Sequence, residues 1–159
     1  MKKPVKILLV EDNYADTRWI IEIFKEYHIP IEIHDVKDGD EALNFLYKKE
    51  KYENVSYPDI IILDLYLPII SGHEVLKKIK NDKNLRDIPV VILTASNSPE
   101  DIKMANTNHV TCYISKPIDF KGLMKIINST KKFGITVPAA LDTPKCHADN
   151  VPSFKHYPI

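Results

Sequence analysis

The sequence has 159 residues, enough for one domain with a buried core, and its hydrophobic fraction of 44% excludes a chain that is disordered throughout. Lys and Arg together number 22, as do Asp and Glu, so the formal net charge is zero and does not favour nucleic acid or a membrane as a partner. No apolar stretch approaches the ~20 residues that a membrane-spanning helix needs. Cys112 and Cys146 show no metal-binding spacing, which fits a reducing compartment. We therefore expect a cytoplasmic protein.

Five short runs rich in isoleucine and valine predict the strands of a buried sheet. The runs are Val5–Val10, Ile31–Val36, Asp59–Leu63, Val90–Leu93 and Cys112–Ile114. Segments with helical patterns separate them, and a fifth such segment follows the last run. In the fourth segment, Ser98-Pro99 has the residues typical of a helix start. Five strands alternating with five helices predict an α/β fold with a parallel sheet covered on both faces.

Two segments lack this periodicity. The polar segment Tyr47–Pro58 is expected to be an exposed loop. From Pro138 onward the sequence is punctuated by prolines, so we expect an irregular extension and not a second domain.

Polar residues that follow the predicted strands carry the chemistry, because ligands of an open parallel sheet bind beyond the carboxyl ends of its strands. These residues are Glu11 and Asp12 after the first strand, Asp64 after the third, Thr94 at the end of the fourth and Lys116 after the fifth. Three clustered carboxylates repel one another unless a cation lies among them, and an all-oxygen set suits Mg²⁺ or Mn²⁺ better than Zn²⁺. A carboxylate nucleophile, a metal, an ammonium and a hydroxyl together indicate a phosphoryl-transfer centre.

Each of these residues taken alone has a simpler explanation. Glu11-Asp12 fits a helix cap, and Lys116 fits a solvated surface lysine. Only their joint placement favours the phosphoryl-transfer site. A magnesium-dependent phosphatase of the aspartyl-phosphate class would resemble a D-x-D pattern, and Tyr66 stands where the second Asp is needed.

The motifs at these strand ends resemble the receiver domain of two-component response regulators. They are V-E-D-N at 10–13, D-L-Y-L-P at 64–68, S-G at 71–72, L-T-A-S at 93–96 and Y-I-S-K-P at 113–117. The loop before Pro58, the run P-V-V-I-L-T-A-S and the tail make the chain similar to small stand-alone receivers partnered with phytochrome-type kinases. The resemblance implies a flavodoxin-like, doubly wound (βα)5 fold with strand order 2-1-3-4-5. It places the receiver domain at residues 4–134 and a C-terminal extension at 135–159.

The resemblance also implies a role for each acidic residue. Asp64 would accept a phosphoryl group from a kinase phosphohistidine. Asp12, Asp64 and the backbone carbonyl of Tyr66 would bind Mg²⁺, and Glu11 would act through a metal-bound water.

Roles on the phosphoryl side follow from the same resemblance. Thr94 would hydrogen-bond the phosphoryl group, and Lys116 would pair with it. Tyr113 matches the family's switch aromatic, which turns inward as Thr94 moves toward the phosphate, although an aromatic in a strand often simply packs. Lys116-Pro117 would be a cis peptide bond.

Several positions are variable or depart from the family pattern. Tyr66 and Ser96 each lie two residues beyond a site residue, where they would flank the phosphoryl group and gate water. His109-Val110 stands where many receivers have Gly-Ala. Trp19 lies on the first helix, which receivers use to dock kinases, but it also fits ordinary packing.

The expected function is a phosphorylation switch, not an enzyme beyond its own phosphorylation and dephosphorylation. The partners implied are a sensor histidine kinase, a downstream protein, and a second copy bound through helix 4, strand 5 and helix 5. The alternative is a pseudo-receiver that binds without phosphorylation, which a missing acid or Lys would favour; none is missing. A transcription factor is disfavoured because the segment after Phe133 is too short for a winged helix.

Overall fold

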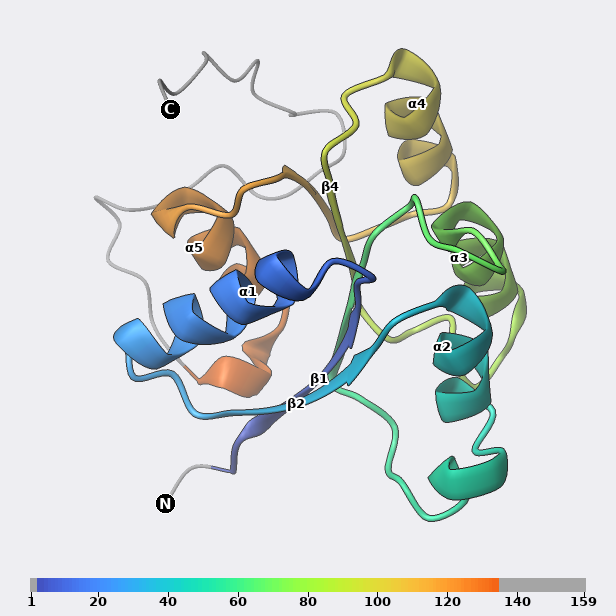
Figure 1. Ribbon diagram of the computed structural model, residues 1–159, viewed down its shortest axis with the longest axis horizontal. Coiled ribbons are helices and arrows are strands. Elements are labelled where there is room, and N and C mark those ends of the chain that lie inside the picture. Colours follow the sequence, from blue (N-terminus) through green and yellow to red (C-terminus); the bar gives the residue numbers. More distant parts are fainter. Residues whose placement is uncertain (1–2, 135–159) are drawn as a thin grey trace.

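A five-stranded parallel sheet lies between two layers of helices in the computed structural model, which describes residues 3–134 (Figure 1). The strands are β1 (Val5–Val10), β2 (Ile31–Val36), β3 (Ile60–Leu63), β4 (Val90–Thr94) and β5 (Cys112–Ser115). They lie in the order β2-β1-β3-β4-β5, and every neighbouring pair is parallel. The predicted fold class and strand order are confirmed, and the predicted strand bounds differ by at most one residue at an end.

The five helices each begin at a side chain that caps the first turn. They are α1 (Tyr14–Glu26), α2 (Gly39–Leu46), α3 (Gly72–Asn81), α4 (Pro99–Thr107) and α5 (Phe120–Asn128). Their N-caps are Asn13, Asp38, Ser71, Ser98 and Asp119, and each side chain accepts a backbone N–H from the residue three positions on. Such caps satisfy donors that the helix itself leaves unpaired. The predicted start at Ser98-Pro99 is confirmed.

The core is divided by the sheet into two layers. Alternate strand residues face opposite sides, so Leu8 and Val10 join one layer while Ile7 and Leu9 join the other. Figure 1 shows α1 and α5 on one side of the sheet and α2, α3 and α4 on the other. This double covering buries all of β3 and β4, as expected for the centre of a parallel sheet.

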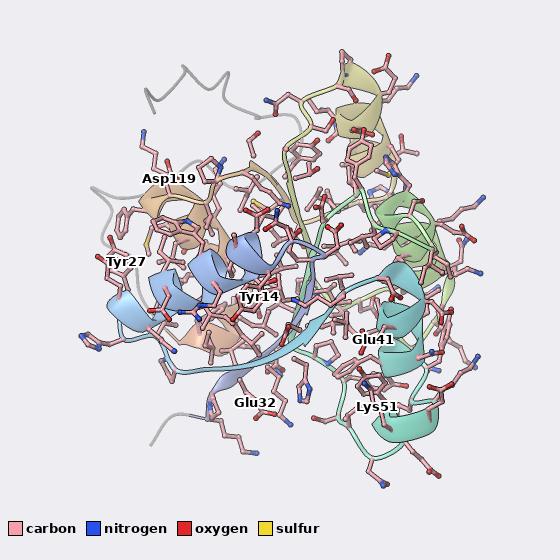
Figure 2. The ribbon with its side chains drawn as sticks, viewed as in Figure 1. Tyr14, Tyr27, Glu32, Glu41, Lys51 and Asp119 are labelled. Atoms are coloured by element: carbon pink, nitrogen blue, oxygen red, sulfur yellow. The ribbon has the colours of Figure 1, made fainter. Side chains whose placement is uncertain are left out.

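The segment between α2 and β3 is exposed over most of its length, but the prediction of an exposed loop at Tyr47–Pro58 is wrong at Tyr52 and at Pro58, which are both buried. Tyr52 shows how the segment is held. This residue ends a short 3-10 helix, η1 (Glu50–Tyr52), and only 9% of it is exposed. Its hydroxyl donates to Glu41 at 2.6 Å, and its ring packs edge-on against Phe45. Lys51 lies 3.3 Å from the same carboxylate (Figure 2). One buried aromatic therefore holds an otherwise polar segment on α2.

The C-terminal end of α4 carries His109, one of the residues that differ from the receivers that the sequence resembles. His109 has φ 53, in the left-handed region, and its N–H and that of Val110 donate to Asn106 and Ala105. This is a Schellman motif, in which glycine is the residue adopted at least cost. His109 therefore forms the same turn that glycine would form, but its side chain makes the left-handed conformation more costly.

The described structure ends in a second 3-10 helix, η2 (Lys131–Phe133), whose Phe133 is buried and stacks on Phe24 at 6.3 Å. The predicted extension at 135–159 lies outside the described residues. Within residues 3–134, no helix is both long enough and apolar enough to cross a membrane.

Candidate functional site

The candidate site lies at the carboxyl edge of the sheet, where four neighbouring strands end. The Asp64 N–H donates to the Val10 carbonyl at 3.0 Å, and the Lys116 N–H donates to the Thr94 carbonyl at 2.9 Å. These backbone bonds extend the pairing of β1 with β3 and of β4 with β5 by one step beyond the strands. The residues that follow each strand are therefore held beside one another, as the sequence predicted.

Three carboxylates converge at this edge. One oxygen from each of Glu11, Asp12 and Asp64 lies within 4.8 Å of the others. Glu11 and Asp64 are buried, while Asp12 is exposed. Burial, together with the charge of Asp64, raises the pKa of Glu11, although hydrogen bonds from Lys116 and the Asn13 backbone oppose the shift. A divalent cation would remove this repulsion, and oxygen-only donors fit Mg²⁺ or Mn²⁺.

Lys116 supplies the positive charge that this cluster has in the structure. Its Nζ lies 2.5 Å from Glu11, 2.8 Å from Asp64 and 3.0 Å from Asp16. Burial opposes the charge, but hydrogen bonds to Asp64, Glu11 and Asp16 outweigh it and raise the pKa of Lys116. The lysine is therefore a permanent cation directed at the predicted phospho-acceptor.

Asp16 is a further partner of Lys116 that the sequence did not predict. It lies in the first turn of α1, where its N–H donates to the capping side chain of Asn13. Its contact with Lys116 joins residues 100 positions apart, and no local sequence pattern signals it. The alternative of a cap at Glu11-Asp12 is wrong, because Asn13 is the cap and Glu11 accepts the Asn13 N–H.

Thr94 and Tyr113 are both buried, and each forms a hydrogen bond with the backbone of Ser96. The Thr94 hydroxyl accepts the Ser96 N–H at 3.4 Å, and the Tyr113 hydroxyl donates to the Ser96 carbonyl at 2.6 Å. Burial raises the pKa of Tyr113 to about 12, with the charge of Asp101 adding to the effect. Tyr113 is thus a buried, neutral phenol, and its predicted inward turn as a switch stays a prediction.

The remaining predicted residues lie around the rim. The Tyr66 N–H donates to Asp64 Oδ1 at 3.2 Å, and 58% of this residue is exposed. The Lys116-Pro117 bond is cis, as predicted. Trp19 is half-exposed, and its indole N–H donates to the Ile118 carbonyl at 2.8 Å, which fixes the ring beside the turn that carries Lys116.

Comparison with known proteins decides the family, because residues 7–128 match the family described as response regulator receiver domain. The chain belongs to this family. Response regulator Rcp1 of Synechocystis sp. is 41% identical over 140 residues, which cover 86% of this chain and 95% of Rcp1. The receiver is therefore a signalling protein of a two-component system, and the predicted recognition is confirmed.

Two solved structures are similar to this receiver in both fold and sequence. The Mn(2+)-bound form of response regulator Rcp1 is 40% identical with a TM-score of 0.71, covering 86% of this chain and all of that one. The phosphorylated cyanobacterial phytochrome response regulator RcpA is 42% identical with a TM-score of 0.71, covering 86% of this chain and 99% of that one. A divalent-metal site in this receiver fits its acidic cluster and the first of these relatives.

Proposed function

We propose that the receiver accepts a phosphoryl group on Asp64 from a histidine kinase, in a reaction that requires Mg²⁺. One observation carries the proposal: the buried Asp64 carboxylate belongs to an acidic cluster able to hold a cation and also contacts the ammonium of Lys116. Asp12, Asp64 and the Tyr66 carbonyl would hold the ion, with Glu11 acting through a bound water. When bound, the ion would neutralise charge on the phosphoryl oxygens.

In the transfer, an oxygen of Asp64 attacks the phosphorus of the donor's phosphohistidine. The P–N bond breaks, and its electron pair stays on the imidazole, which takes up a proton. Lys116 contacts Asp64 in this structure and would pair with a phosphoryl oxygen after the transfer. Thr94, buried at the end of β4, would donate to another oxygen, so that positioning and charge stabilisation supply most of the catalysis.

The output would begin at Thr94. Its hydroxyl accepts the Ser96 N–H in this structure, and the Ser96 carbonyl accepts the Tyr113 hydroxyl. Movement of Thr94 toward a phosphoryl group would therefore alter the segment that holds Tyr113. Phosphorylation would shift an existing equilibrium between two arrangements of this segment, and the shifted face would bind a downstream protein.

The kinase partner is proposed to be of the phytochrome type. The support is the 42% sequence identity between this chain and RcpA, which is described as a cyanobacterial phytochrome response regulator. Binding of a second copy of the receiver through α4, β5 and α5 is proposed as one response to phosphorylation. Mg²⁺ is proposed as the physiological ion. The competing pseudo-receiver function is disfavoured because each acid, the hydroxyl and the lysine stand at the expected strand ends.

The proposal is tested by incubation with acetyl phosphate in Mg²⁺ and in EDTA, followed by intact-mass measurement. Wild type should gain one phosphoryl group in Mg²⁺ only, while Asp64→Asn should gain none in either buffer. Asp87→Asn, the same substitution at an exposed residue, should behave as wild type. Equal labelling of Asp64→Asn and wild type would contradict the proposal.

A further inference from the structure

Asp101 is a buried carboxylate outside the acidic cluster. It lies in the first turn of α4 and is only 5% exposed. Its Oδ2 accepts the hydroxyls of Tyr66 at 2.6 Å and Ser96 at 2.5 Å, and its Oδ1 lies 2.6 Å from His73 Nε2. We call these four residues, Asp101, Tyr66, Ser96 and His73, the Asp101 clasp. It joins α4 to α3, to the loop after β3 and to the loop after β4.

The clasp is built around a charged acceptor. Burial opposes ionisation of Asp101, but hydrogen bonds from Ser96, Tyr66 and His73 hold its pKa well below its usual range. Hydrogen bonds to an ionised carboxylate are about twice as strong as neutral ones. The Tyr66 ring also meets the His73 ring edge-on, with centroids 5.8 Å apart. An exposed tyrosine at the rim is therefore held from two sides.

Both ends of the clasp reach the phosphorylation site within two residues. The backbone N–H of Tyr66 donates to Asp64, and that of Ser96 donates to Thr94. Asp101 forms no hydrogen bond with Asp64 or Thr94, but it holds the side chains of Tyr66 and Ser96, which border them. Tyr66 and Ser96 therefore form the hydrogen-bonded connection between Asp101 and the site.

We infer that Asp101 is a positioning residue that holds Tyr66 and Ser96 across the rim of the site and thereby prolongs the life of the aspartyl phosphate. The inference rests on the proposed phosphorylation of Asp64. In hydrolysis, a water oxygen bonds to phosphorus and the bond from phosphorus to the Asp64 oxygen breaks. The electron pair stays on the carboxylate, and inorganic phosphate leaves with the protons of the water. A tethered Tyr66 restricts the approach of that water, and a released one admits it.

The test measures the lifetime of the phosphorylated state after loading with acetyl phosphate and Mg²⁺ and rapid removal of the donor. Asp101→Ala should shorten the lifetime about fivefold, equivalent to a barrier lower by ~1 kcal/mol. Asp101→Asn should stay within about twofold of wild type, because its amide oxygen still accepts both hydroxyls while its NH₂ faces His73. Glu100→Ala, an exposed acid truncated on the same helix turn, should leave the lifetime unchanged.

A background that lacks both hydroxyls separates positioning from a general structural effect. Tyr66→Phe/Ser96→Ala should itself be short-lived, and adding Asp101→Ala to it should change nothing further. A further loss in that background, or a wild-type lifetime for Asp101→Ala, would overturn the inference while leaving the proposed function intact. If Asp101→Ala does not fold, Tyr66→Phe decides alone: a shorter lifetime supports the clasp and an unchanged one overturns it. No phosphorylation of wild type would instead overturn the proposed function.

Discussion

Lys116 should have a stability effect whose size depends on Mg²⁺. In the metal-free protein, its Nζ is the cation that contacts two buried carboxylates, Glu11 with 2% and Asp64 with 7% of the side chain exposed. Lys116→Met keeps the length of the side chain and removes the charge. Loss of one partner of a buried ion pair typically costs 3–5 kcal/mol, because the other charge stays buried and unpaired.

The lower end of that range applies here, because both acids keep a second donor. Glu11 accepts the Asn13 N–H at 3.0 Å, and Asp64 accepts the Tyr66 N–H at 3.2 Å. The third acid, Asp16, is 38% exposed and regains water. We therefore expect Lys116→Met to lose ~3 kcal/mol of unfolding free energy in EDTA. A loss of that size lowers Tm by about 10 °C for a domain of this size.

Saturating Mg²⁺ should reduce the deficit to about 1 kcal/mol, because the variant lacks the ammonium that contacts Glu11 and Asp64 and should therefore bind the ion more tightly than wild type. An ion that binds only the folded state then stabilises the variant more than it stabilises wild type. The assay is urea unfolding at neutral pH in EDTA and in Mg²⁺. Lys80→Met is the matched control: Lys80 is half-buried, but its Nζ donates to the Arg86 carbonyl, away from the site. Its stability loss should be the same in both buffers. An equal loss for Lys116→Met in EDTA and Mg²⁺ would refute the view that Lys116 stands in for the metal.

Three further predictions concern pH, the α4 turn and self-association. Burial raises the pKa of Glu11, so the folded state holds a proton on this residue more tightly than the unfolded state does. In EDTA, the free energy of unfolding should therefore fall as pH rises from the ordinary glutamate pKa of 4.5 through the raised pKa. Urea unfolding of Glu11→Gln at several pH values should show no such fall. His109→Gly should stabilise the protein by about 1 kcal/mol in thermal melts, since φ is 53 there, whereas His34→Gly in β2 should destabilise it. Beryllofluoride with Mg²⁺ should increase the mass found by sedimentation for wild type and not for Asp64→Asn, and an unchanged wild-type mass would remove the proposed dimer.

The sheet and the site could be predicted because each rests on local signals joined by a general rule. Runs such as Ile60–Leu63 are apolar at every position, as only a strand covered on both faces needs to be. Once the strands are parallel, their carboxyl ends share one edge, which brings Asp64 beside Lys116 although 52 residues separate them.

The Tyr52 anchor and the Asp101 clasp could not be predicted in this way. Tyr52 lies in a polar segment, and its burial depends on a partner, Glu41, on the preceding helix. From the sequence, Asp101 is expected to be an ordinary acidic residue in the first turn of a helix. Its three partners come from different loops and helices, and only the packed structure decides which hydroxyl meets which carboxylate.

Two short segments connect the candidate site with the Asp101 clasp. Residues 64–66 begin with an acid of the cluster and end with Tyr66 of the clasp, and residues 94–96 begin with Thr94 and end with Ser96 of the clasp. A phosphoryl group on Asp64 would draw Lys116 and Thr94 toward itself, while Asp101 holds the far end of each segment in place. The same tether that shields the phosphate from water would thus resist the movement that signals its presence. Asp101→Ala should therefore shorten the phosphorylated state and also ease the conformational shift, so that beryllofluoride binds this variant more tightly than wild type.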